Sequence, residues 1–166
     1  MADPFHQVGV TFGGVQAVQT WADFLLWEHV LNDNQQVAAI VELGTSRGGF
    51  SRYLWAQAAT RGMRFVTYDR ERPVNPPPGF HQADVFTDAG WIAHDFHQDG
   101  PTLLFCDNGD KPRELATYAP YLAAGDVVVV HDWLTEVGPD DIPDTLTETH
   151  GDLCDQLGSM SRVFTA

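Results

Sequence analysis

Residues 37–51 read Val37-Ala-Ala-Ile-Val-Glu-Leu-Gly-Thr-Ser-Arg-Gly-Gly-Phe-Ser51. The first seven residues form an almost continuous apolar run, which is typical of a buried central strand in a parallel sheet. The run ends at Gly44, and Gly48 and Gly49 follow closely. Because glycine has no Cβ and accepts positive φ, the stretch predicts a strand-to-helix turn that lets a ligand approach the backbone.

Apolar stretches of strand length recur along the rest of the chain, at residues 64–68, 80–83, 102–106, 126–130 and 160–165. Helical patterns alternate with them, at residues 17–31, 51–59, 88–96, 113–122 and, more weakly, 144–157. This alternation predicts an α/β fold, with a doubly wound, Rossmann-like, mostly parallel sheet and helices on both faces. In such folds ligands bind beyond the carboxyl ends of the strands, where the strand order reverses.

Length, charge and cysteine content restrict the kind of protein. The 166 residues fit one domain, residues 1–166, in which residues 1–16 are an N-terminal extension that either closes as a lid or forms a fixed surface strand. A net charge of −14 argues against a nucleic acid partner. The chain lacks a membrane-spanning apolar run, a secretory signal and a CxxC pair. We expect a cytoplasmic protein with no membrane partner.

The glycine-rich turn disfavours two common cofactor classes. A P-loop needs lysine where Phe50 stands. The dinucleotide motif GxGxxG needs a second glycine within the interval that Thr45, Ser46 and Arg47 occupy, so a nicotinamide-dependent oxidoreductase is a less favoured alternative. Glu42, two positions before the first glycine, suits a cationic group such as an ammonium or sulfonium.

The segment from Val41 to Ser51 resembles the first motif of class I S-adenosylmethionine-dependent methyltransferases. Asp69 follows Gly44 by 25 positions, close to the spacing at which an acid binds ribose hydroxyls in nucleotide-binding folds. The resemblance implies that Asp84 contacts the adenine. The residues expected to bind the cofactor are Glu42, Gly44, Thr45, Ser46, Gly48, Ser51, Asp69, Arg70, Asp84, Val85 and Asp107.

Two later strand ends carry groups that bind metals. Asp107 follows one predicted strand, and His131 and Asp132 follow the next. Two carboxylates and an imidazole could hold Mg²⁺ or Mn²⁺, and such an ion would lower the pKa of an acceptor hydroxyl. His131 has two further interpretations, as the catalytic base itself or as a hydrogen-bond donor to a backbone carbonyl.

Residues 107–133 are similar to metal-dependent O-methyltransferases of antibiotic and sugar tailoring, and to the cephalosporin hydroxylase-like branch. Those relatives carry an adjacent pair of acids where this chain has His131 and Asp132, so the metal site departs from the family pattern. They often carry a histidine shortly after the first acid, where this chain has Lys111. Lys111 is expected to act as a catalytic base or substrate-orienting cation if burial lowers its pKa, or else to be a surface lysine.

The resemblance weakens after Asp141. Relatives end with an antiparallel pair of strands, and this sequence has room for one, Ser161 to Thr165. The open sheet edge would then be covered in a homodimer. The expected activity is methyl transfer from S-adenosylmethionine to a hydroxyl of a small molecule, and the alternative is a catalytically silent protein that binds the same cofactor.

Overall fold

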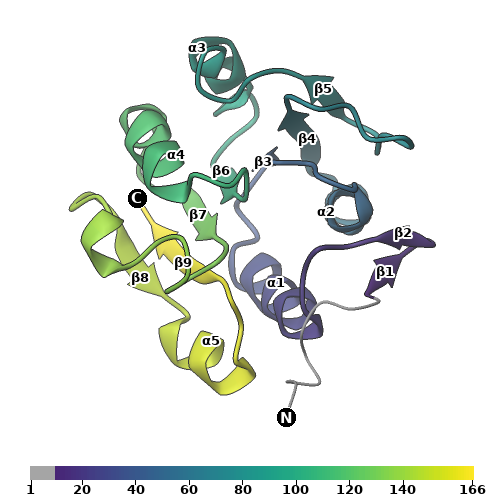
Figure 1. Cartoon of the computed structure of the whole chain (residues 1–166). Helices are drawn as coiled ribbons and strands as arrows, with labels where there is room; N and C mark the ends of the chain where they lie inside the picture. The colour runs from purple at the N-terminus through teal and green to yellow at the C-terminus, as the bar shows by residue number, and fades with distance from the viewer. Residues whose placement is uncertain (1–9) are drawn as a thin grey trace.

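A computed structural model describes residues 10–166, which build one seven-stranded sheet in the order β5-β4-β3-β6-β7-β9-β8 (Figure 1). The five strands from β5 to β7 run parallel, whereas β9 is antiparallel to both of its neighbours. The predicted mostly parallel α/β sheet is confirmed. The strands are β3 (Ala39–Leu43), β4 (Arg64–Asp69), β5 (Phe80–Gln82), β6 (Thr102–Cys106), β7 (Val127–Val130), β8 (Thr147–Thr149) and β9 (Arg162–Thr165).

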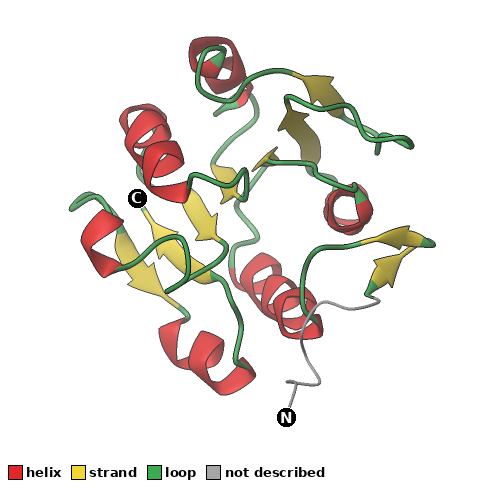
Figure 2. Ribbon diagram, in the orientation of Figure 1, coloured by secondary structure: helices red, strands yellow, loops and turns green. Residues whose placement is uncertain are grey.

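Helices cover both faces of the sheet (Figure 2). Side chains alternate along each strand, so Ile40 packs with α1, α2 and α5 while Val41 packs with α3 and α4. Among the described residues, no helix has both the length and the apolar character needed to cross a membrane. The helices are α1 (Trp21–Asp33), α2 (Gly49–Arg61), α3 (Ala89–Ile92), α4 (Lys111–Tyr118) and α5 (Gly151–Leu157), with short 3₁₀ turns η1 (Ala93–Asp95), η2 (Ala119–Tyr121) and η3 (Pro139–Asp141).

The C-terminal part of the chain differs from its prediction. The helix expected over residues 144–157 is instead the strand β8 followed by the shorter helix α5. His150 connects them with a left-handed φ of 60°. β8 pairs with β9 from Thr147 to Thr149, so the antiparallel pair is complete and the prediction of a missing strand is wrong. β9 is paired on both sides and leaves no open edge for a homodimer to cover.

The N-terminal segment forms a small hairpin of β1 (Thr11–Phe12) and β2 (Val15–Gln16), which lies against α2 (Figure 1). The Phe12 ring packs edge-on against Tyr53 of α2, with ring centroids 5.6 Å apart. Residues 10–16 of the expected extension therefore form a docked hairpin, and residues 1–9 lie outside the described part of the chain. The following helix begins at Trp21, later than predicted, because Thr20 and Asp23 form a capping box there.

Candidate functional site

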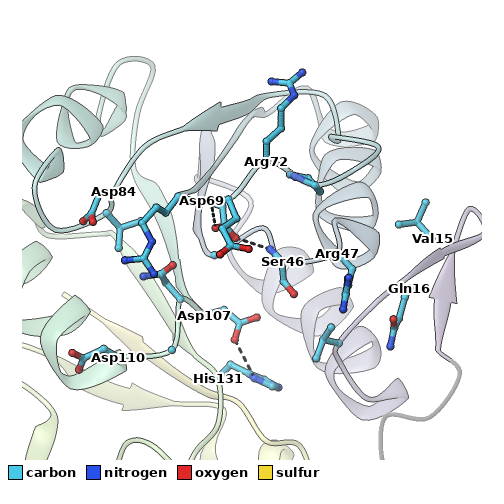
Figure 3. Close-up of a pocket in the computed structure, with 18 of the residues that line it drawn as sticks. Val15, Gln16, Ser46, Arg47, Asp69, Arg72, Asp84, Asp107, Asp110 and His131 are labelled. Carbon is cyan, nitrogen blue, oxygen red and sulfur yellow. Dashed lines mark hydrogen bonds and ion pairs between the residues drawn. The ribbon is translucent and has the colours of Figure 1, made fainter.

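A cleft of about 1060 Å³ opens at the carboxyl ends of the parallel strands (Figure 3). It lies at the switch in strand order, because the chain continues from β3 to β4 on one side and later places β6 on the other. The sequence predicts a ligand site at this place. Segments from the hairpin, the turn after β3 and the loops after β4, β5, β6 and β7 line the cleft, namely residues 14–16, 18, 44, 46–47, 69–75, 84–86, 107–111 and 131–132.

The turn between β3 and α2 fits closely against the next strand end. Gly44 has a φ of +101°, and a Cβ placed on it would lie 2.3 Å from the carbonyl oxygen of Asp107. Gly48 precedes α2 in a left-handed conformation. Ser46 also has a positive φ of 50°, which is uncommon for a residue with a side chain. The turn thus brings its backbone to the cleft wall without side-chain bulk at Gly44.

Asp69, at the end of β4, is fixed against this turn. Its carboxylate accepts hydrogen bonds from the backbone N–H of Ser46 at 2.8 Å and of Glu71 at 2.9 Å (Figure 3). Each carboxylate oxygen can accept a further hydrogen bond. Arg70 lines the same part of the cleft. Asp69 is therefore a preorganised acceptor for hydroxyl groups of a ligand.

Asp84 lies on another part of the cleft wall, after β5 (Figure 3). Val85, the next residue, also lines the cleft. The Asp84 carboxylate accepts hydrogen bonds from the backbone N–H groups of Phe86 and Thr87, which hold its pKa below the ordinary value. The Val85 carbonyl accepts a hydrogen bond from the Tyr118 hydroxyl. These contacts fix the loop that, according to the family resemblance, would contact the adenine.

Four of the predicted cofactor residues do not line the main cleft, namely Glu42, Thr45, Gly48 and Ser51. The first three border a separate cavity of about 10 Å³ beneath the turn, which is about the space of one water. Burial raises the pKa of Glu42 to about 8, and its Oε2 atom has no hydrogen-bond partner among the described residues. Glu42 therefore lies behind the turn, where it does not face the cleft.

The three predicted metal ligands, Asp107, His131 and Asp132, come together in the cleft. His131 Nδ1 lies 3.2 Å from Asp107 Oδ1 (Figure 3) and 3.2 Å from Asp132 Oδ1. One ligand atom from each of the three residues falls within 4.8 Å of the others. The His131 side chain is buried, and neither ring nitrogen makes a well-aligned hydrogen bond with the described residues. We call these three residues the acid cluster.

Lys111, the first residue of α4, is a fixed cation beside the acid cluster. Its ammonium lies 2.7 Å from Asp132 Oδ2, 2.8 Å from Glu136 Oε2 and 3.6 Å from Asp107 Oδ1. Burial by itself would lower the pKa of Lys111, but these carboxylates raise it above the ordinary value. The lowered pKa on which its expected base role depends is therefore absent. The side chain is only 2% exposed, which contradicts the alternative of a surface lysine. The role of a substrate-orienting cation stays a prediction.

The electrostatics of His131 follow from the same crowding of carboxylates. Burial by itself would lower its pKa, but contacts with Asp107, Asp132 and Asp23 raise it well above the ordinary value. His131 and Lys111 in turn hold the pKa of Asp132 below its ordinary value, against the effect of burial. Asp132 has a left-handed φ of 57°, a strained conformation that often marks a functional position.

Several supporting residues were missed by the sequence analysis. Asp23 lies behind the cluster, 3.8 Å from His131 Nε2, and accepts hydrogen bonds from Ser159 and Ser161. Gln19 donates to Asp107 Oδ2 at 2.7 Å. The Thr20-x-x-Asp23 pattern predicts a helix start, but nothing in it indicates that the same carboxylate approaches a residue more than one hundred positions later.

Glu114 of α4 orders the loop that carries Asp107. Its Oε1 atom accepts hydrogen bonds from the backbone N–H groups of Asn108 and Asp110. Burial raises the pKa of Glu114 to about 8. The sequence gives no sign of this role, because an acid in the first turn of a helix is also favourable as a solvent-exposed charge.

Comparison with known proteins identifies solved structures of similar fold. No protein-family model matches the chain, and no curated protein matches its sequence. A structure of cmcI with SAH is 16% identical, with a TM-score of 0.68 over 95% of this chain and 81% of that one. A structure of cmcI with Mg and SAM is also 16% identical, with a TM-score of 0.60 over 74% of this chain and 57% of that one.

A mutant of MtNAS is 12% identical, with a TM-score of 0.56 over 87% of this chain and 59% of that one. The chain thus spans less than two thirds of the length of this neighbour and of cmcI with Mg and SAM. At sequence identities this low, structural similarity shows the fold alone. These likenesses show that the chain has the Rossmann-like α/β fold shared by proteins whose structures hold SAH or Mg and SAM.

Proposed function

We propose that the chain binds S-adenosylmethionine in the cleft and transfers its methyl group to a hydroxyl of a small molecule. The observation that carries the proposal is the meeting of the Gly44 turn, Asp69 and the acid cluster in one cleft at the strand-order switch. The similar cmcI structures that hold SAH or Mg and SAM support the choice of cofactor.

The cofactor would extend across the cleft from Asp84 to the acid cluster. The adenine would lie near Asp84 and Val85, and the ribose hydroxyls would donate to the fixed carboxylate of Asp69. The amino acid portion would lie over the Gly44 turn, where the backbone is free of a Cβ. This arrangement directs the methyl group toward Asp107 and His131, where an acceptor has room to bind.

The acid cluster offers a donor set that fits a divalent cation. Asp107 and Asp132 supply carboxylate oxygens, and the buried His131 directs an unpartnered ring nitrogen between them. These residues would hold Mg²⁺ or Mn²⁺. A bound ion would lower the pKa of the acceptor hydroxyl, so that the oxygen reacts as an alkoxide or phenolate.

The transfer itself is a displacement at carbon. The acceptor oxygen attacks the methyl carbon, the carbon–sulfur bond breaks, and its electron pair stays on the sulfur of the product S-adenosylhomocysteine. The proton of the hydroxyl leaves to water in the open cleft. The cleft residues contribute mainly by positioning the two reactants.

A catalytically silent binding protein is the second candidate, and the observation that favours it is the Lys111 ammonium beside the acid cluster. Incubation with S-adenosylmethionine carrying a labelled methyl group, Mn²⁺ and a panel of catechols and sugars separates the two. We expect label in at least one acceptor and its loss in Asp107→Asn. Binding of the cofactor without transfer to any acceptor, with or without metal, would favour the silent alternative.

A further inference from the structure

Lys111 is the only lysine in the chain and one of the largest fully buried side chains. It enters the acid cluster from the start of α4 and contacts carboxylates from the ends of two neighbouring strands. Exposed lysines usually keep their ammonium in water. A buried ammonium with three carboxylate partners is therefore a built feature of the site, and the proposed reaction makes no use of it.

The ammonium and a divalent ion would compete for the same two carboxylates. Lys111 Nζ lies within 3.6 Å of Asp107 and 2.7 Å of Asp132, and these two carboxylates are the oxygen donors of the acid cluster. Two cations at such distances repel each other strongly at a site that is partly shielded from water. A divalent ion can therefore bind all three ligands only after the ammonium has moved away.

We propose that Lys111 is a built-in competitor of the metal. Its ammonium occupies the acid cluster when no ion is bound and moves to Glu136 when an ion binds. The inference deepens the proposed function and rests on its metal site. Glu136 lies outside the cluster, already 2.8 Å from the ammonium, and its side chain is 44% exposed. The flexible lysine stem allows the ammonium to leave the cluster while keeping this ionic partner.

This arrangement has a consequence for the metal-free protein. Asp107 and Asp132 lie close together in a partly buried site, where unpaired carboxylates are costly. Lys111 balances their charge without a metal. Its presence should therefore stabilise the empty site and weaken the binding of any ion that takes its place.

The direct test is the titration of the full chain with Mn²⁺ in the absence of S-adenosylmethionine. The electron paramagnetic resonance signal of free Mn²⁺ measures how much of the ion is bound. We expect Lys111→Gln to bind Mn²⁺ about tenfold or more tightly than the wild type, since the competing charge is gone. Arg113→Gln is the matched control. It removes the same charge from the same helix, but the Arg113 guanidinium lies over the Phe86 ring, 3.9 Å from its centroid. Its Mn²⁺ affinity should equal that of the wild type.

Thermal denaturation gives a second readout. In EDTA, Lys111→Gln should have a lower melting temperature than the wild type. Adding Mn²⁺ should raise the melting temperature of the variant and change that of the wild type little. If Lys111→Gln does not fold, Glu136→Gln replaces it. This variant removes the second partner of the ammonium and should bind Mn²⁺ more weakly than the wild type.

Equal Mn²⁺ affinity in the wild type and Lys111→Gln, or no binding in either, would overturn the proposal. So would an unchanged affinity in Glu136→Gln, should that variant be the one measured. Calorimetry with S-adenosylmethionine on the same proteins distinguishes a failure of this inference from a failure of the proposed function. Failure to bind the cofactor, with the expected Mn²⁺ results intact, would remove the proposed function and leave the competition between Lys111 and the metal standing.

Discussion

At the scale of single residues, Gly44 has two separate reasons to be glycine. Its φ of +101° is unfavourable for any residue with a side chain, and a Cβ would collide with the carbonyl of Asp107. The sequence indicates the first requirement, since the residue ends an apolar strand. The second depends on the neighbouring strand and emerges only from the fold.

Gly44→Ala should therefore destabilise the protein more than its backbone conformation alone would explain. We expect a loss of about 3 kcal/mol in the free energy of unfolding, measured by urea denaturation. Gly62→Ala is the control, because Gly62 also has a positive φ of +71° but nothing lies within 4 Å of its added Cβ. The control should lose only about 1 kcal/mol, and equal losses would contradict the predicted collision.

Buried Glu42 predicts a pH dependence of stability. Its folded pKa of about 8 lies above the ordinary value of 4.5, so its stabilising contribution is complete below pH 4.5 and is lost as pH rises through about 8. Between these values the free energy of unfolding should fall with a slope of up to about 1.4 kcal/mol per pH unit from this group. Urea denaturation at pH 5.5, 6.5 and 7.5 measures the slope.

In Glu42→Gln the side chain at position 42 cannot ionise. This variant should therefore lose the contribution of Glu42 to the slope of the free energy of unfolding against pH. Glu114→Gln should have a similar effect, because burial also raises the pKa of Glu114 to about 8. Slopes that match the wild type in both variants would show that these carboxyl groups ionise in the folded protein as easily as in the unfolded chain.

The environment of Lys111 could not be predicted from the sequence. The order Asp107 to Lys111 predicts a lysine near an acid at a strand end. Its pKa is raised by Asp107, four positions earlier, and by Asp132 and Glu136, which the fold brings in from the loop after β7. Neither spacing nor composition reports a contact between residues more than twenty positions apart.

At the scale of elements, the β1–β2 hairpin docks on α2 through a close backbone contact. A Cβ on Gly49, the first residue of α2, would lie 2.3 Å from the carbonyl oxygen of Gln16. Gly14, Val15 and Gln16 also line the cleft. The glycine therefore lets the hairpin complete one wall of the site.

Gly49→Ala should push this hairpin away from α2. Hydrogen exchange should become faster at residues 11–17, and S-adenosylmethionine should bind more weakly, while the sheet strands keep their protection. Gly90→Ala in α3 is the matched control, since nothing lies within 4 Å of its added Cβ. Unchanged exchange at residues 11–17 in Gly49→Ala would contradict this account of the docking.

Strand β8 shows why some elements escape prediction. Thr147 and Glu148 are exposed, and Thr149 is only half-buried, so the strand carries no alternating apolar pattern. Pairing with β9 at the edge of the sheet defines it. By contrast β3, β6 and β7 are fully buried apolar runs, and the sequence predicts them to within two residues at each end.

At the scale of the whole molecule, parallel strands explain why so much of the site could be predicted. Asp69 ends one strand, and Asp107 and His131 follow two others, yet strands that run in one direction end at one edge. The sequence therefore predicts that these groups share a cleft. It does not predict which of them face that cleft, and Glu42 and Ser51 turn out to be buried behind the turn.

Calorimetric titration with S-adenosylmethionine, and separately with NAD⁺, shows whether the cleft binds the proposed cofactor. We predict saturable binding of S-adenosylmethionine, weakened about tenfold or more in Asp69→Asn, which costs about 1.4 kcal/mol or more because the fixed carboxylate loses its charge. NAD⁺ should give no binding heat. Absence of S-adenosylmethionine binding to the folded wild type, or binding of NAD⁺ in its place, would rule out S-adenosylmethionine as the cofactor of this cleft.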